Sequence, residues 1–358
     1  MLSALASVLV CAALVVTRGW HGRFSLDGVE GVQKFHLNPT PRIGGLGAAI
    51  GLIAGALLAP APVASVLWPM LWAGLPAFAF GLAEDLTRRV SVRSRLLATM
   101  ASGLVAWWLT GVSLTRVEVW GVDALLAWGP ASVLFTAFAV GGVANAVNII
   151  DGFNGLAAGV LLITLLALGV IAQTVGDTAL AGACLVVGGA VLGFMVVNFP
   201  FGKIFLGDGG AYLLGFIIAW LAVLLASRNP GVSPWAGLLA CAYPVLEVLF
   251  TIYRRTRRRH HPGHPDRLHL HSLINARVTR KWFPALPPVL KNAAVSPFIW
   301  VCSAVPAACG LLFRAQGTTL ILMFIGFAGL YAWAYRRLVR FSLGVRPLGD
   351  PASGVIGK

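Results

Sequence analysis

The sequence predicts an all-α, polytopic integral membrane protein with about eleven transmembrane helices. Of its 358 residues, 58% are hydrophobic and only 11% are charged, whereas about a quarter of the residues in soluble domains are charged. The mean hydropathy is +0.85. Stretches of about 20 residues, long enough for a helix to cross a bilayer, repeatedly lack Asp, Glu, Lys and Arg. These observations exclude a soluble enzyme, a disordered chain and a fibrous repeat.

The apolar stretches give the expected spans in chain order. The first is expected to be a retained helix rather than a cleaved signal, because no base precedes it and bases follow it. The stretch 44–83 is long enough for two helices, with a proline-rich turn at 60–62. The expected spans lie within 1–17, 44–83 (two), 96–115, 124–150, 152–176, 178–202, 209–227, about 229–253, 292–313 and 315–335. We expect one membrane-embedded domain over 1–358, with its motifs in 27–275, a large loop at 254–291 and a tail at 337–358.

The charges predict the orientation of these spans. The chain has 27 Lys and Arg residues against 12 acids, a formal net charge of +15. If the N-terminus lies outside, only Arg116, Arg228 and Arg314 fall on the outer side, and the C-terminus is cytoplasmic. In a soluble protein this excess would suggest nucleic acid. Here we expect no nucleic-acid partner, but cytoplasmic loops beside anionic membrane lipids.

Polar residues recur in the tight turn between the fifth and sixth expected spans. Asn148, Asp151 and Asn154 are spaced by three residues, beside Gly152 and Gly155. Polar side chains buried between two spans are costly unless a ligand, a metal or one another satisfies them. The pattern predicts a binding site. The alternative is a helix-capping turn, with Asp151 or Asn154 as the N-cap.

Two further acidic segments lie at span ends on the same predicted face. Asp208 opens the eighth span between glycines, near Lys203, which we expect to contact substrate. Magnesium typically takes one or two carboxylates and leaves its other positions to water and phosphate, so Asp208 predicts a metal site, with an N-cap as the alternative. Glu84 and Asp85 end the third span. Adjacent carboxylates need a nearby cation, and a metal or a cluster of salt bridges would each supply one.

Two basic loops complete this face. The larger holds an arginine run at 254–259, expected to anchor the ninth span at the membrane surface, and then five histidines. A zinc site is disfavoured there because no cysteine is near. The other is a compact loop with prolines and glycines, for which a topology-setting role is the alternative. The residues expected to contact the phosphates and sugar of a substrate are Lys34, His36, Arg42, Asp266, Arg267, His269 and His271.

Carboxylates for a metal, bases for phosphates and apolar helices on one face together predict phosphoryl transfer at a membrane surface, with a lipid as one substrate. A transporter or flippase of anionic lipid-linked sugars is the alternative, although transporter sites usually lie near the midplane within repeated halves. A non-catalytic scaffold is a third class, and it would need neither Asp151 nor Asp208.

These motifs, in this order, resemble the polyprenyl-phosphate N-acetylhexosamine-1-phosphate transferases, the MraY and WecA group of glycosyltransferase family 4. The resemblance covers about residues 27–275. It rests on Pro-Arg-x-Gly-Gly at 41–45, the acidic pair at 84–85, Asn-x-x-Asn-x-x-Asp-Gly-x-x-Gly-Leu at 145–156, Gly-Asp-x-Gly at 207–210 and the histidine-rich loop at 264–271. That loop looks like the WecA branch.

The resemblance implies an enzyme of the bacterial inner membrane, with its active site on the cytoplasmic face and Mg²⁺ as cofactor, or Mn²⁺ in its place. It implies transfer of HexNAc-1-phosphate from a UDP-N-acetylhexosamine to polyprenyl phosphate (undecaprenyl phosphate in bacteria), with release of UMP, to begin a surface polysaccharide such as O-antigen. By motif match Asp208 is the main metal ligand, with Glu84 and Asp85 beside it as catalytic and metal-binding residues. The turn around Asp151 would bind the nucleotide, and the histidine loop the sugar and diphosphate. Monomer and homodimer both stay open.

Three positions depart from the family pattern. Glu84 and Glu247 stand where aspartates are usual, and Asn154 stands where WecA-like members carry a second Asp. The expected mechanism is direct attack by the lipid phosphate on the sugar-bearing phosphorus, because a phosphate monoester with its second pKa near 6 is largely ionised at neutral pH. A two-step route with Asp85 as nucleophile is the alternative. The sequence does not distinguish between UDP-sugars or between polysaccharide pathways.

Overall fold

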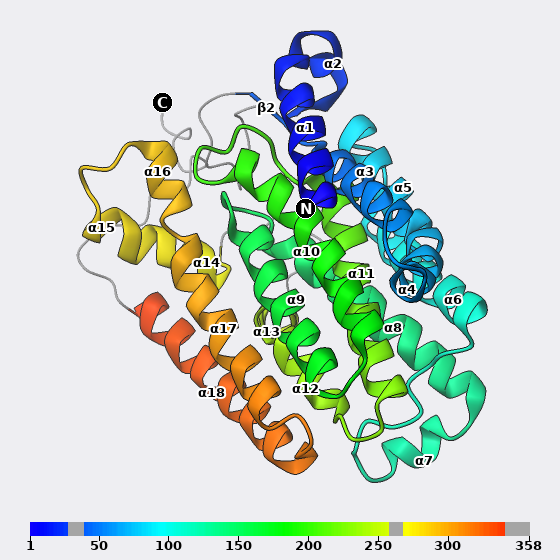
Figure 1. The fold of residues 1–358 in the computed structure, drawn as a ribbon. Coiled ribbons are helices and arrows are strands. Elements are labelled where there is room, and N and C mark those ends of the chain that lie inside the picture. The colour runs from blue at the N-terminus through cyan, green and yellow to red at the C-terminus, as the bar shows by residue number, and fades with distance from the viewer. Residues whose placement is uncertain (28–38, 258–267, 341–358) are drawn as a thin grey trace, which may run out of the picture.

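The computed structural model describes residues 1–27, 39–257 and 268–340, and in these ranges the chain is almost entirely helical (Figure 1). A short antiparallel ladder pairs Leu26 with Pro41 and Asp27 with Thr40. The elements are α1 (Leu2–Val16), α2 (Arg18–Ser25), β1 (Leu26–Asp27), β2 (Thr40–Pro41), α3 (Gly44–Leu57), α4 (Ala61–Ala73), α5 (Leu75–Thr87), α6 (Val92–Thr110), α7 (Val122–Leu126), α8 (Gly129–Ile150), α9 (Leu156–Thr174), α10 (Thr178–Asn198), α11 (Gly207–Arg228), α12 (Pro234–Ala240), α13 (Ala242–Arg257), α14 (Leu270–Ile274), a π-helical turn (Asn275–Thr279), α15 (Arg280–Trp282), α16 (Pro288–Ala293), α17 (Ser296–Leu312) and α18 (Gly317–Arg340).

The helices confirm the prediction of an all-α membrane protein. Among the described residues, six helical segments are long and apolar enough to cross a membrane, and three bent helix pairs raise the number of candidate spans to nine. The shorter apolar helix α3 lies where another span was expected. The count of eleven and the orientation stay predictions.

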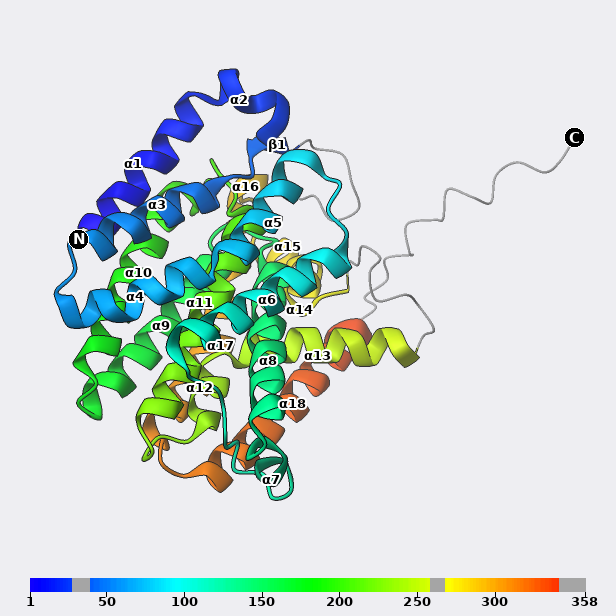
Figure 2. The same cartoon turned by 90° about the vertical axis from the view of Figure 1, so that its right-hand side faces the viewer.

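The ninth expected span, 229–253, differs from a straight crossing. It breaks into α12 and α13, whose axes differ by 80°. Pro244 explains the break, because a proline cannot donate to the carbonyl four residues back, and that residue, Ala240, is the last of α12. As a result α13 turns sideways out of the bundle (Figure 2).

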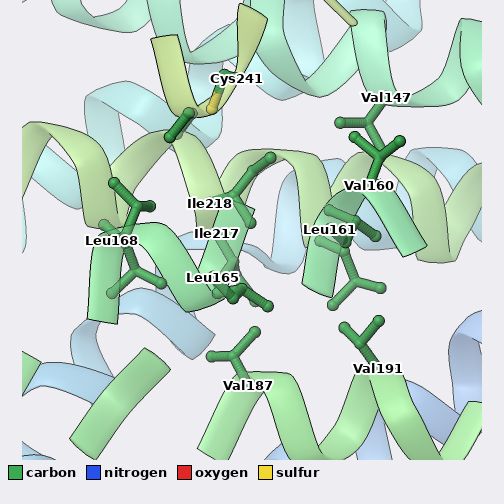
Figure 3. Close-up of a cluster of buried hydrophobic side chains, with 14 of the residues drawn as sticks. Val147, Val160, Leu161, Leu165, Leu168, Val187, Val191, Ile217, Ile218 and Cys241 are labelled. Atoms are coloured by element: carbon green, nitrogen blue, oxygen red, sulfur yellow. The ribbon is translucent and has the colours of Figure 1, made fainter. Parts of the chain in front are cut away.

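The core of the protein is centred on α11. This helix is apolar on all sides, which is typical of a helix surrounded by others, and it packs against α3, α5, α8, α9 and α12. Trp220 and Phe216 are among its fully buried side chains. Figure 3 shows aliphatic side chains of α8, α9, α10 and α11 packed in one cluster, with Cys241 of the α12–α13 break at its edge. The central position of α11 fixes its N-terminus, where Asp208 lies.

Small residues let α1, α3 and α10 approach closely. On α1, Ser3, Ser7 and Cys11 are spaced by one helical turn and face the glycines of α3: a Cβ on Gly51 would lie 2.6 Å from the Ser3 carbonyl oxygen. On α10, a Cβ on Gly193 would collide with the Ala4 carbonyl oxygen. In a bilayer, helices associate mainly through such close packing, because lipid tails are as apolar as the side chains.

Candidate active site

Four helix ends meet at one end of the bundle, which we call the site face: α5 and α8 end there, and α3 and α11 begin there. Backbone hydrogen bonds join the segments, from Gly44 N to the Phe205 carbonyl at 2.9 Å and from Gly45 N to the Leu206 carbonyl at 2.8 Å. A Cβ on Gly45 would collide with the backbone of Gly210, and one on Gly81 would lie 2.6 Å from the Asp208 backbone. The glycines of the 41–45 and 207–210 motifs therefore serve this close approach.

Asp85 holds the start of α11 in place. Its side chain is only 1% exposed. Its carboxylate accepts hydrogen bonds from the backbone N–H groups of Asp208 and Gly209, both at 2.9 Å, and from Arg42 Nε at 3.0 Å. A carboxylate at a helix N-terminus is stabilised by the free N–H groups and the helix dipole. Both oxygens of Asp85 are therefore engaged by the protein itself.

Asp208 is the carboxylate that faces the site, in the first turn of α11 rather than at its N-cap. Its Oδ1 accepts from Asn148 Nδ2 at 3.0 Å and lies 3.6 Å from an Arg42 guanidinium nitrogen. Its Oδ2 accepts from Arg95. Asn148 is in turn fixed by Tyr212, whose hydroxyl donates to its Oδ1 at 3.3 Å. The structure thus brings Arg42, Asn148 and Asp208 together as predicted.

Arg95 and Tyr212 belong to this cluster but were not among the predicted site residues. Several arginines follow the acidic pair in the sequence, and nothing there singled out Arg95 as a site residue. The helix period supplies the missing signal, because Arg95 is followed at Thr99, Ser102 and Ala106 by buried positions on one face of α6. The face of α6 that packs inward therefore directs Arg95 to Asp208.

Asp151 lies in the turn between α8 and α9, close to the same carboxylates. Burial, followed by the negative charges of Asp208 and Asp85, raises the pKa of Asp151 to about 7. The helix-capping alternative is wrong here, because the N-cap of α9 is Gly155, with φ of +75° and no side-chain cap. Asp151 is thus a half-buried carboxyl that does not cap α9 and instead accepts the backbone N–H of Gly207 at the start of α11.

The Asn154 side chain is buried and hydrogen-bonded to the protein itself rather than exposed in an open space. It is 6% exposed, and its Nδ2 donates to the Pro200 carbonyl at 3.0 Å. Its backbone N–H donates to Asn292 and its carbonyl accepts from Ser296, so the turn is tied to α16 and α17. An aspartate would lack the N–H donor for Pro200, which gives a physical reason for Asn at this position. A direct contact between Asn154 and substrate stays a prediction.

A second polar cluster surrounds Glu247 on α13, which is 1% exposed. His269 Nδ1 lies 2.9 Å from Glu247 Oε1, and the Tyr243 hydroxyl donates to Oε2 at 3.2 Å. The backbone N–H of Leu270 also donates to Oε2, at 3.2 Å. His271 Nδ1 lies 3.1 Å from the Tyr243 oxygen. Sequence reasoning noted Glu247 only as a departure from the family pattern, and it missed Tyr243.

These contacts fix which nitrogen of each imidazole carries the proton. A carboxylate only accepts, so His269 Nδ1 donates to Glu247; Tyr243 uses its proton on Glu247, so His271 Nδ1 donates to Tyr243. Burial lowers the pKa of His271 to about 4, so the ring is neutral at pH 7. The His271 Nε2 atom is then an acceptor. For His271 this differs from the donor role expected from sequence, because its Nδ1–H donates to Tyr243, whose own proton is donated to Glu247.

The two clusters meet at the turn that carries Asp151. The His271 ring packs edge-on against Phe153, with centroids 5.6 Å apart. A Cβ on Gly152 would lie 3.7 Å from His271 Nε2. The histidine pair and the carboxylate–arginine cluster therefore lie beside the same turn. That they form one site stays a prediction.

The remaining predicted residues contribute differently. Glu84 Oε2 accepts from the Val90 backbone N–H at 2.8 Å and so holds the loop between α5 and α6. Lys203 is exposed in the loop before α11, and within the described ranges it makes no hydrogen bond or ion pair. Lys34, His36, Asp266 and Arg267 lie outside the described residues.

The donor set fits a hard cation such as Mg²⁺. Beside Asp208 the described side chains offer carboxylate and amide oxygens and no thiolate. Nowhere in the described part do three His, Cys, Asp or Glu side chains form a complete cage, so Asp208, Glu84 and Asp85 do not converge as a triad. Magnesium does not need one, because substrate phosphates and water supply its other ligands.

Comparison with known proteins agrees with this chemistry. Residues 67–226 match the glycosyl transferase family 4 model. The decaprenyl-phosphate N-acetylglucosaminephosphotransferase of Mycolicibacterium smegmatis is 30% identical over 337 residues, which cover 84% of this chain and 79% of the relative. Its namesake in Mycobacterium tuberculosis is 33% identical over 275 residues, covering 67% of this chain and 66% of the relative. The undecaprenyl-phosphate α-N-acetylglucosaminyl 1-phosphate transferase of Escherichia coli O157:H7 is 28% identical over 317 residues, covering 85% and 82%.

The fold and the site together define a multi-pass membrane enzyme of the glycosyl-1-phosphate transferase class. Within that class, the chain belongs to the polyprenyl-phosphate N-acetylhexosamine-1-phosphate transferase family. The predicted resemblance is confirmed. The transporter and scaffold alternatives find no support in these relatives.

Proposed function

We propose that this protein transfers N-acetylhexosamine 1-phosphate from a UDP-sugar to polyprenyl phosphate, undecaprenyl phosphate in a bacterial inner membrane. The names of the relatives favour N-acetylglucosamine as the sugar. The observation that carries the proposal is the placement of Asp208 between Arg42 and Arg95, next to the turn that meets the histidine pair. The product would be a polyprenyl-diphospho-sugar that begins a surface polysaccharide such as O-antigen.

In the proposed reaction an oxygen of the lipid phosphate forms a bond to the sugar-bearing phosphorus, and the bond from that phosphorus to the bridging oxygen breaks, releasing UMP. Arg42 and Arg95 stand where two guanidinium groups can bind phosphate oxygens. Asp208, with Asp151 nearby, would hold Mg²⁺ or Mn²⁺. A bound metal would neutralise the phosphates and align them in line. The engagement of both Asp85 oxygens supports the one-step route over a covalent Asp85 intermediate.

The histidine pair is proposed to bind the sugar. The neutral His271 imidazole has an Nε2 lone pair that accepts hydrogen bonds from hydroxyl groups or from an amide N–H, both of which an N-acetylhexosamine carries. Phosphate oxygens, which only accept, do not pair with such atoms. The eleven-span topology, the cytoplasmic site and the outer N-terminus are part of the proposal, and the distribution of bases supports them.

The test is incubation of membranes containing the protein with labelled UDP-GlcNAc or UDP-GalNAc and polyprenyl phosphate. Magnesium-dependent label in the lipid phase, with one UMP released for each sugar transferred, is expected. Label transferred without UMP release, or no transfer with any UDP-HexNAc, contradicts the proposal. A phospho-sugar trapped on Asp85 in the absence of acceptor contradicts the one-step route.

A further inference from the structure

A basic cavity lies between α13 and α18, apart from the proposed transfer site. Its volume is about 250 Å³, and four arginines line it: Arg254, Arg257, Arg336 and Arg340. Aromatic rings contribute to the same wall, with Phe250 and Tyr335 centroids 4.6 Å apart. Among the described residues that line it there is no carboxylate. Figure 2 shows α13 and the end of α18 side by side where α13 leaves the bundle.

Anchoring at the membrane surface, the role expected from the sequence for the arginine run, does not account for this arrangement. Anchoring needs only exposed bases, whereas Arg254 is 8% exposed. The cavity also uses arginines from a different helix, Arg336 and Arg340 on α18. Within the described chain, neither of these two is paired with a carboxylate. Four positive groups from two helices around one cavity form a site for an anion.

The surroundings of the cavity select an amphiphilic anion. Next to the cavity-lining residues in the sequence, the two helices expose apolar side chains: Leu249 and Ile252 on α13 are 50% and 49% exposed, and Leu330 and Trp333 on α18 are 56% and 58% exposed. Basic pockets between membrane helices bind anionic lipid head groups, because guanidinium groups pair with phosphate while acyl chains cover the apolar helix faces.

We propose that this cavity binds the phosphate head group of an anionic phospholipid, with its acyl chains along α13 and α18. The site is separate from the catalytic carboxylates and would hold a resident lipid rather than a reactant. Because α13 also carries Glu247, about two helical turns before Arg254, a lipid bound here would steady the helix that positions the histidines.

The test measures lipid binding to the full-length protein in neutral detergent by native mass spectrometry. Phosphatidylglycerol should bind one to one, and phosphatidylcholine should bind much more weakly. Each of Arg336→Gln and Arg340→Gln should weaken phosphatidylglycerol binding about fivefold, and the double variant about 25-fold. Arg337→Gln is the matched control, because Arg337 lies on the same turn but its guanidinium stacks over Trp333, 5.9 Å from the ring centroid. The Arg337→Gln variant should bind phosphatidylglycerol with the affinity of the wild type.

Three results would overturn the proposal. The double variant could bind phosphatidylglycerol as tightly as the wild type. Inorganic phosphate at equal concentration could displace the lipid completely, which would make the cavity a site for free anions. The double variant could raise the KM for polyprenyl phosphate while phosphatidylglycerol binding stays intact, which would assign the cavity to the acceptor. Transfer activity measured in neutral detergent checks the proposed function separately.

Discussion

Replacing Glu247 with Gln tests whether a buried carboxylate sets the chemistry of the histidine pair. The wild-type carboxylate receives His269 Nδ1 at 2.9 Å, the Tyr243 hydroxyl at 3.2 Å and the Leu270 N–H at 3.2 Å. Gln has nearly the same shape but one acceptor oxygen and no charge, and its amide nitrogen would face a donor. The tautomers of His269 and His271 would then no longer be fixed.

The expected magnitude follows from the hydrogen bonds that an uncharged amide cannot accept. A hydrogen bond to a charged group contributes about 1.5–3 kcal/mol, which corresponds to roughly a 10- to 150-fold loss in kcat/KM if the imidazoles act in the transition state. The assay is transfer from labelled UDP-GlcNAc to polyprenyl phosphate in purified, detergent-solubilised protein. The loss should appear in the kinetics for the UDP-sugar, while the KM for the lipid acceptor changes little.

Two further variants make the result interpretable. Glu247→Asp keeps the charge and should recover part of the activity. Glu118→Gln makes the same chemical change in the loop between α6 and α7, where the carboxylate accepts from the Ser233 hydroxyl, and it should leave transfer within about twofold of wild type. If Glu247→Gln folds normally and keeps kcat/KM within about threefold of wild type, the positioning argument is refuted.

Three other outcomes are expected. Asp208→Asn should lower transfer by about a thousandfold or more and raise the Mg²⁺ concentration needed for residual activity, measured by label in the lipid phase; near-normal magnesium dependence would remove Asp208 from the metal role. Asn154→Asp loses the donor to the Pro200 carbonyl and should cost about 1–3 kcal/mol of stability, seen as a lower thermal unfolding midpoint. Because the pKa of His271 is lowered to about 4, its neutral form stabilises the fold fully above about pH 6.5, and up to about 1.4 kcal/mol per unit should be lost as the pH falls from there toward 4. The thermal unfolding midpoint of the His271→Asn variant should fall less between pH 7 and pH 5 than the midpoint of the wild type. Equal decreases in the two proteins would contradict the lowered pKa of His271.

The sequence alone predicted where the helices lie, because a helix that crosses a bilayer must be about 20 residues long and largely apolar. Each expected span is occupied by a helix or a bent pair in the described chain. The break in the ninth span depends on one residue, Pro244, inside an otherwise apolar run. An apolar stretch of the right length satisfies the rule whether or not the helix is straight, so counting charges did not reveal that α13 leaves the bundle.

The sequence predicted a site residue where the residue type and its neighbours point to one role. It predicted less where two interacting residues lie far apart in the chain. Asp208 stood out as a lone carboxylate between glycines, but its partner Arg95 lies 113 positions earlier in the chain. The motif at 84–85 predicted Asp85 as a site residue, and the structure places Asp85 beside the backbone of Asp208. That its two oxygens hold the start of α11 depends on how α5 meets α11, which glycine packing determines in three dimensions. Local periodicity contains no such information.

The charges of the site explain why a divalent cation belongs to the proposal. Arg42 and Arg95 are already matched by Asp85 and Asp208, so this cluster is close to neutral before any substrate arrives. The diphosphate of a UDP-sugar and a lipid phosphate monoester would add about three to four negative charges. Two like charges about 4 Å apart repel by roughly 4 kcal/mol at the effective dielectric of a protein surface. A guanidinium that turns toward a phosphate would loosen its hold on Asp208, and a carboxylate released in this way is a ligand for Mg²⁺. Substrate binding and metal binding at this site should therefore strengthen each other.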